Sequence, residues 1–261
     1  MRYTAFTNVV SASLGLLLIV LAGHGFRCDG RTILISSFSG LMLVLSSACS
    51  LQVLKNGTVA LSSLFGTAGL IVPCIAGIFL FGTPMSRGQW LGISLFFVAA
   101  YLLISSSAKI VCKFTFKTFL LLIGVMLTNG LTMLAQQMFS HYVPDGDVSV
   151  FSFLTFGIVG IFMVFMAVYA AAKSPRAAQD KLTPGLLGMG TVLAVAVFVI
   201  NQLATLSTTL VPPVILFTLI NGGSTIIGAI VAAICFHEKL TVRSVLGIVI
   251  GVGAMVIIKA T

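Results

Sequence analysis

Charged residues are scarce in this sequence. Asp, Glu, Lys and Arg make up only 7% of its 261 residues, whereas 59% are hydrophobic and the mean hydropathy is +1.19. A soluble domain has about 25% charged residues, so an ordinary soluble protein is excluded and a protein that crosses a membrane several times is indicated. The net charge of +9 comes mainly from Lys and Arg at the ends of apolar runs. Cations there favour lipid headgroups, so the bilayer is the expected partner and nucleic acid is not.

Groups that carry chemistry are also few. Asp and Glu together number five, and no apolar run holds a charged residue near its middle, where a charge usually marks an ion or proton path. The five cysteines include no Cys-x-x-Cys pair, so we expect neither a disulfide framework nor a metal site. No nucleophile lies in a pattern with a base that suggests an enzyme. We therefore expect no enzymatic activity, no cofactor and no carboxylate-based proton site.

Long apolar runs dominate what remains. A helix needs about 20 apolar residues to cross the hydrocarbon of a bilayer, and nine segments meet this length. They are residues 3–23, 32–54, 57–82, 88–108, 117–140, 147–172, 184–206, 210–236 and 241–259. The connections are short, as in helical hairpins. The sequence therefore predicts an all-α, polytopic membrane protein with about nine transmembrane helices.

The third and fourth segments resemble the eighth and ninth in sequence pattern and in length. A shift of 155 residues, from Leu91 to Leu246, aligns two Leu-Gly-Ile triplets and gives both helix–hairpin–helix units the same length. Five crossings separate the corresponding segments, and an odd number makes the two units run in opposite directions. We therefore predict two inverted-topology repeats, 1–112 with four helices and 113–261 with five. Many secondary transporters form two access states from such repeats.

The hairpins of these two units carry a family resemblance. The second loop reads His237-Glu238-Lys239-Leu240-Thr241, and the first, Gly82 to Ser86, keeps the glycine and the length. They resemble the G-E-[RK]-L-[ST] loop of the ten-helix EamA-like branch of the drug/metabolite transporter superfamily, over nearly the whole chain. The resemblance marks Gly82, Glu238 and Lys239 as repeat-loop residues. It also implies that the family's first helix has no counterpart here.

Neutral polar side chains inside the segments are the candidate substrate-binding residues. By their i, i+3, i+7 spacing, Asn129, Thr132 and Gln136 share one helix face. The full set of candidates is Ser47, Ser50, Asn129, Thr132, Gln136, Asn201, Thr205, Asn221 and Thr225. An amide in hydrocarbon needs a partner or water. These groups therefore either join helices by hydrogen bonds or line a cavity, as the resemblance implies for the helices that carry most of them.

The resemblance implies a permease that moves a small polar metabolite or drug by alternating access, in the cytoplasmic (inner) membrane of a bacterium. The alternative is a non-transporting structural or regulatory subunit, or a truncated remnant, because the family's first helix also lines its cavity. The orientation stays open. The distribution of Lys and Arg places the N-terminus in the cytoplasm, whereas the resemblance implies a cytoplasmic C-terminus, and nine helices cannot satisfy both.

Overall fold

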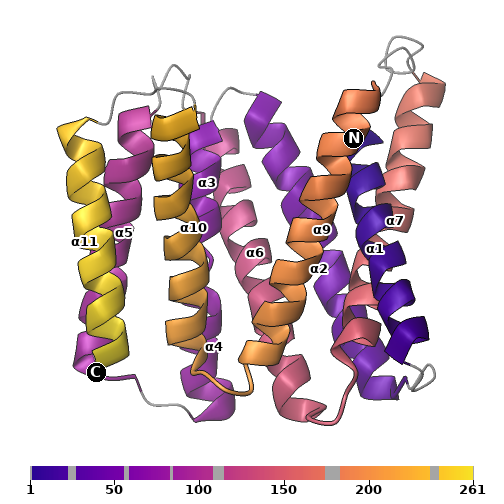
Figure 1. The fold of residues 1–261 in the computed structure, drawn as a ribbon, viewed down its shortest axis with the longest axis horizontal. Helices are drawn as coiled ribbons and strands as arrows, with labels where there is room; N and C mark the ends of the chain where they lie inside the picture. The colour runs from indigo at the N-terminus through magenta and orange to yellow at the C-terminus, as the bar shows by residue number, and fades with distance from the viewer. Residues whose placement is uncertain are drawn as a thin grey trace. The chain divides into compact units, whose positions relative to one another are not determined.

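The computed structural model describes residues 2–22, 28–55, 59–82, 85–107, 115–173, 183–235 and 241–260. Within these ranges every regular element is an α-helix, so the predicted all-α class is confirmed (Figure 1). The helices are α1 (Arg2–Ala22), α2 (Gly30–Lys55), α3 (Val59–Ala68), α4 (Ile71–Phe81), α5 (Arg87–Ser107), α6 (Phe116–Tyr142), α7 (Val148–Lys173), α9 (Pro184–Ser207), α10 (Pro213–Cys235) and α11 (Val242–Ala260).

The helices have the length and the surface of membrane spans. Among the described residues, α1, α2, α6, α7 and α9 are long and apolar enough to cross a bilayer. Helices α5, α10 and α11 contain 21, 23 and 19 residues and are therefore about 30 Å long. Large apolar side chains cover the outside, and Leu21, Ile161 and Val192 are each more than 70% exposed. A soluble protein rarely exposes so large an apolar surface to water. This is therefore an all-α membrane protein.

Local sequence signals explain where several helices begin. Helix α5 starts with a capping box: Gln89 N–H donates to Ser86 Oγ at 3.0 Å, and Ser86 N–H donates back to Gln89 Oε1 at 3.1 Å. Before α7, Asp147 Oδ1 accepts the N–H of Ser149 at 2.7 Å. Helix α9 begins at Pro184, and proline suits a first helical position because no N–H is needed there.

The predicted span 57–82 is not one helix. It divides into α3 and α4, with a turn at Gly69 and Leu70. Pro73 has no N–H to donate to the carbonyl of Gly69, and its ring crowds that carbonyl in a continuous helix. The N–H groups of Gly69 and Leu70 instead donate to Gly66 O and Thr67 O, both at 3.2 Å. The chain therefore passes the break in tight i→i−3 turns.

The described helices form two compact units, each described here by itself. Unit 1 comprises Met1–Val44 and Ala135–Thr209, and unit 2 comprises Leu45–Leu134 and Leu210–Thr261. Each unit takes helices from both predicted repeats, and both α2 and α6 contribute residues to each unit. The predicted repeat boundary between residues 112 and 113 lies outside the described residues, so the division into repeats stays a prediction.

In unit 1, α7 packs against α1, α2 and α9. Phe156 of α7 lies with Phe198 of α9 and Ala12 of α1 in one apolar cluster. Phe151, nearer the start of α7, stacks on Phe139 of α6 with ring centroids 4.5 Å apart. These aromatic contacts are fully or almost fully buried, and they fix the end of α6 that carries the polar residues described below.

In unit 2, α5 and α11 pack closely along their lengths. Gly92, near the start of α5, lies so close to Ile258, near the end of α11, that a side chain on the glycine would overlap it. Further along, Gly251 of α11 faces Ala99 of α5. The two helices are therefore antiparallel (Figure 1). They are also the pair that the 155-residue shift aligns, and the inverted repeat itself stays a prediction.

The break between α3 and α4 lies directly against α6. A Cβ atom on Gly69 would be 2.8 Å from the carbonyl oxygen of Met126, and one on Gly130 would be 2.6 Å from Val72 Cβ and would overlap the carbonyl of Gly69. Real Cβ atoms do not approach this closely. Glycine at both positions therefore lets the two backbones touch, as in other membrane helix pairs.

We expect Gly130→Ala to destabilise the protein by about 1–3 kcal/mol, the usual range for overpacking, since the added methyl group must displace backbone at the α3–α4 break. The measurement is thermal unfolding in detergent. Gly157→Ala is the matched control, because nothing lies within 4 Å of its new Cβ and alanine is the better helix former. Equal unfolding temperatures for the two variants would contradict the close contact.

Single cysteines at the two hairpins test the inversion. In a chain whose native cysteines are replaced, Pro84→Cys and Lys239→Cys should react with a membrane-impermeant maleimide from opposite sides of the bilayer. The reason is that antiparallel equivalents place their preceding loops at opposite ends. Labelling of both from the same side would exclude an inverted repeat.

Candidate functional site

The clearest polar cluster lies between α6 and α9 in unit 1. The amide nitrogen of Gln136 donates to Oδ1 of Asn201. One turn on, Ser140 Oγ donates to the carbonyl of Thr205 at 2.9 Å and also bonds the hydroxyl of Thr208. The i, i+4 spacing puts Gln136 and Ser140 on one face of α6 and Asn201 and Thr205 on one face of α9, with Thr208 directly after the end of α9. Two polar faces therefore meet, and the structure brings together three of the predicted residues: Gln136, Asn201 and Thr205.

This cluster retains unused hydrogen-bonding capacity. Gln136 is only 8% exposed and Thr205 is fully buried. Gln136 Oε1 and the Nδ2 of Asn201 nevertheless make no hydrogen bond within the described part of the chain, and neither belongs to the fully buried unpaired atoms. A carboxamide has two donors and two acceptor positions. The pair therefore retains an acceptor and a donor that no described residue uses.

A second amide lies deeper, between α9 and α7. Gln202 Oε1 accepts from Ser152 at 3.3 Å, and its amide nitrogen donates to Ser149 at 3.4 Å. Gln202, Ser152 and Ser149 therefore tie these two helices together. Ser140 and Thr208 belong with the first cluster but are absent from the predicted set. Their i+4 spacing from Gln136 and i+3 spacing from Thr205 is the signal that could have found them.

Among the described residues, four further polar side-chain atoms are buried without a hydrogen-bond partner. They are Ser36 Oγ, Ser39 Oγ, Gln137 Oε1 and Thr155 Oγ1. All four belong to unit 1, and their side chains are at most 5% exposed. A buried polar group without a partner is rare because it forfeits its hydration. Unit 1 therefore combines the Gln136–Asn201 pair with an excess of polar groups that its own side chains do not satisfy.

The predicted residues of unit 2 bond mainly to backbone. Asn129 Nδ2 donates to the carbonyl of Gly66 at 2.8 Å, one of the carbonyls at the α3–α4 break. Thr132 donates to the carbonyl of Thr128, and Asn221 donates to that of Phe217. Asn129 therefore closes the break against α6, which is a structural role, and the structure does not bring it together with Gln136 by any hydrogen bond.

Fewer contacts are described for the remaining predicted residues. Ser47 and Ser50 are half-buried and make no hydrogen bond within the described part of the chain. The side chain of Thr225 and all of Glu238 and Lys239 lie outside the described residues. Gly82 ends α4 with φ of +61°, and its N–H bonds the carbonyl of Gly77. This left-handed conformation favours glycine, so Gly82 shapes the turn.

Neither thiols nor metal ligands form a cluster in what the structure describes. No group of three or more His, Cys, Asp or Glu residues lies close enough together to hold a metal ion, and Cys28, Cys49 and Cys74 are free thiols. Partial burial and the charge of Asp29 raise the pKa of Cys28, in the loop before α2. The reactive thiolate form of Cys28 is therefore scarce at neutral pH.

Comparisons with known proteins bear on the fold. No family model and no curated protein matches the sequence. Among solved structures, 26 chains match. One of them, described only as the crystal structure of a protein, superposes with a TM-score of 0.76 and 11% sequence identity, over 98% of this chain and 87% of its own. At that identity the likeness supports the helical architecture alone.

The Gln136–Asn201 bond can be measured by a double-mutant cycle. Gln136→Leu, Asn201→Leu and the double variant should show a coupling of about 0.6 to 2 kcal/mol in unfolding free energy, as for other hydrogen bonds between membrane helices. Thr191 of α9 bonds only its own helix, so Gln136→Leu combined with Thr191→Val should be additive. A Gln136–Asn201 coupling of zero would contradict the contact.

Proposed function

We propose that this protein is a secondary transporter, of the EamA-like kind, that carries a small polar metabolite through alternating access in a bacterial inner membrane. The observation that carries the proposal is the Gln136–Asn201 pair, which keeps a free donor and a free acceptor inside a helical membrane protein. Polar groups at such a depth are usually functional when they are not used up in joining helices.

The chemistry of the pair favours a neutral or zwitterionic solute. Gln136 Oε1 can accept from a hydroxyl or ammonium group, and the Nδ2 of Asn201 can donate to a carbonyl or carboxylate. Each neutral hydrogen bond contributes about 0.5 to 1.5 kcal/mol net. Two such bonds give weak binding, and a transporter needs weak binding because it must release its solute on the far side.

The neighbouring hydroxyls position the pair. Thr205 donates to the carbonyl of Asn201 at 2.9 Å, and Ser140 links the next turn of α6 to Thr205 and Thr208 of α9. These bonds fix the rotation of α9 against α6. Preorganised groups lose little freedom when a ligand binds, so the hydroxyls would favour one orientation of the solute.

The break between α3 and α4 supports the same proposal. Discontinuous helices are typical of secondary transporters, where the unwound backbone can rearrange as access alternates. Here a side-chain bond from Asn129 to the carbonyl of Gly66 joins the break to α6. In this proposal Asn129 holds one access state and does not contact the solute.

Transport by the reconstituted protein tests the proposal. Proteoliposomes loaded with one metabolite at a time, chosen from amino acids, sugars, purines and quaternary amines, should show counterflow of at least one compound. Gln136→Leu and Asn201→Leu should each raise its KM by up to about tenfold, because each removes one solute hydrogen bond. The matched control is Thr191→Val, which removes a hydroxyl from an exposed face of α9.

Two results would contradict this function. If both leucine variants transport with the wild-type KM, the amide pair is not the binding site. If the folded wild-type protein transports no compound of the panel, the alternative of a non-transporting structural or regulatory subunit is favoured.

A further inference from the structure

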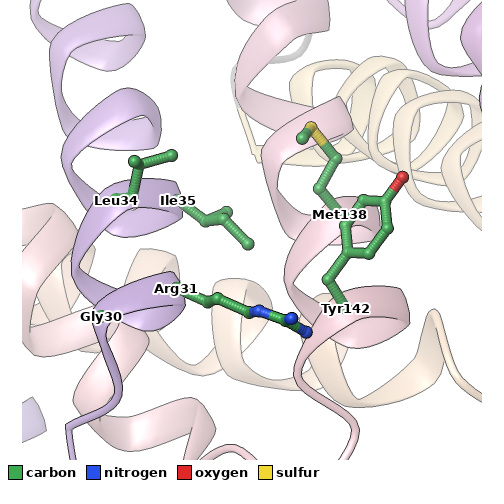
Figure 2. Close-up of a pocket in the computed structure, with 6 residues that line it drawn as sticks. All are labelled: Gly30, Arg31, Leu34, Ile35, Met138 and Tyr142. Atoms are coloured by element: carbon green, nitrogen blue, oxygen red, sulfur yellow. The ribbon is translucent and has the colours of Figure 1, made fainter.

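A pocket of about 310 Å³ opens between the beginning of α2 and the end of α6, both in unit 1. Figure 2 shows the residues that line it. They are Gly30, Arg31, Leu34, Ile35, Met138 and Tyr142. Its volume is at the lower end of the range for small-molecule pockets, about 300 to 1,000 Å³. Its chemistry differs from that of the Gln136–Asn201 pair, because its lining is mostly apolar and includes one charged side chain, Arg31.

The walls of this pocket are apolar. Leu34 and Ile35 of α2 and Met138 of α6 supply aliphatic and thioether surface, and the ring of Tyr142 adds an aromatic one (Figure 2). Leu34 is 70% exposed and the neighbouring Ile33 is 50% exposed. The outer surface beside the pocket is therefore as apolar as its interior, and hydrocarbon chains cover such a surface in a membrane.

Arg31 provides the single charge. Its side chain extends from α2 across the base of the pocket toward α6 (Figure 2), and it is exposed. It makes no hydrogen bond or ion pair with any residue that the structure describes. The nearest acidic residue in sequence, Asp29, already accepts the N–H of Gly30 at 2.8 Å. Among the described residues the guanidinium therefore has no partner, and an anion from outside the chain can bind it.

The pocket lies at the ends of two candidate membrane spans, where lipid headgroups are expected. Arg31 is the second residue of α2 and Tyr142 is the last residue of α6, and both helices are candidate membrane spans. Tyrosine and arginine concentrate at this interface because each has an apolar part and a polar end. A molecule that fills the pocket must therefore be apolar along the walls and anionic at Arg31.

We propose that this pocket binds one anionic phospholipid. An acyl chain lies against Leu34, Ile35 and Met138, and the headgroup phosphate binds the guanidinium of Arg31, which can donate two parallel hydrogen bonds to phosphate oxygens. Basic pockets between transmembrane helices bind lipid headgroups in the same manner. The proposal does not depend on transport, since it concerns a separate surface of unit 1.

Native mass spectrometry of the full chain in non-ionic detergent tests this binding. The probes are phosphatidylglycerol and phosphatidylcholine with identical acyl chains, titrated separately. The wild-type protein should bind phosphatidylglycerol more tightly. Arg31→Gln should weaken that binding about fivefold, the effect of one basic residue near a lipid surface. It should weaken phosphatidylcholine binding less, because the choline cation offsets the charge of the same phosphate. Arg31→Lys should keep the preference because it keeps the charge.

Three matched variants sharpen the test. Arg87→Gln removes an exposed arginine at the first residue of α5 and should leave the preference intact. Asp29→Asn should tighten phosphatidylglycerol binding, because it removes a negative charge near Arg31 while asparagine still caps the helix. Met138→Trp should weaken the binding of both lipids, because the larger side chain fills the pocket.

The assignment is overturned by any of three results. In the first, Arg31→Gln and the wild-type protein bind phosphatidylglycerol equally. In the second, Arg87→Gln weakens its binding as much as Arg31→Gln does. In the third, inorganic phosphate at the same concentration displaces the lipid from the wild-type protein. That result would show that the site binds a free anion and not a lipid. If Arg31→Gln and Arg31→Lys unfold at the same temperature as the wild-type protein, misfolding is excluded as the cause of weaker lipid binding.

Discussion

Every backbone N–H and C=O group that faces hydrocarbon must find a partner within the protein, because lipid supplies none. Helices meet this requirement within their own segment, so each described element is one. Where the helix is interrupted at Gly69 and Leu70, i→i−3 bonds and the side chain of Asn129 replace the missing bonds. The break is permissible only because α6 lies against it, and glycine at 69 and 130 allows that approach.

The two units meet the same requirement with different groups. In unit 2, the side chains of Asn129, Thr132 and Asn221 each donate to a backbone carbonyl. In unit 1, Gln136 and Asn201 bond each other and retain a donor and an acceptor. Polar groups of the same types therefore bond to backbone in one unit and to another side chain in the other.

Much of the architecture could be predicted from composition and spacing. Apolar length alone locates the helices to within a few residues, because a span needs a fixed thickness of hydrocarbon. The division of the span 57–82 is also marked in the sequence, by Pro73, yet a proline can kink a membrane helix without ending it. The outcome depends on Gly130 of a distant helix, and no local pattern contains that information.

The site was less predictable than the fold, for a related reason. The face shared by Asn129, Thr132 and Gln136 follows from helix geometry, but their partners come from different helices. Asn129 meets the α3–α4 break and Gln136 meets Asn201, so one face divides into a structural part and a candidate binding part. Buried hydroxyls such as Ser36 and Thr155 escape prediction because serine and threonine in membrane helices usually bond their own backbone.

Helix α6 runs without interruption from one compact unit into the other, and the change falls between Leu134 and Ala135. Gln136 is the second residue of α6 after this change. An unbroken helix is stiff, so a rotation or shift at one point is transmitted along its axis. A displacement of α6 at the Gly130 contact would therefore also displace Gln136, which lies little more than a turn and a half further along the same helix.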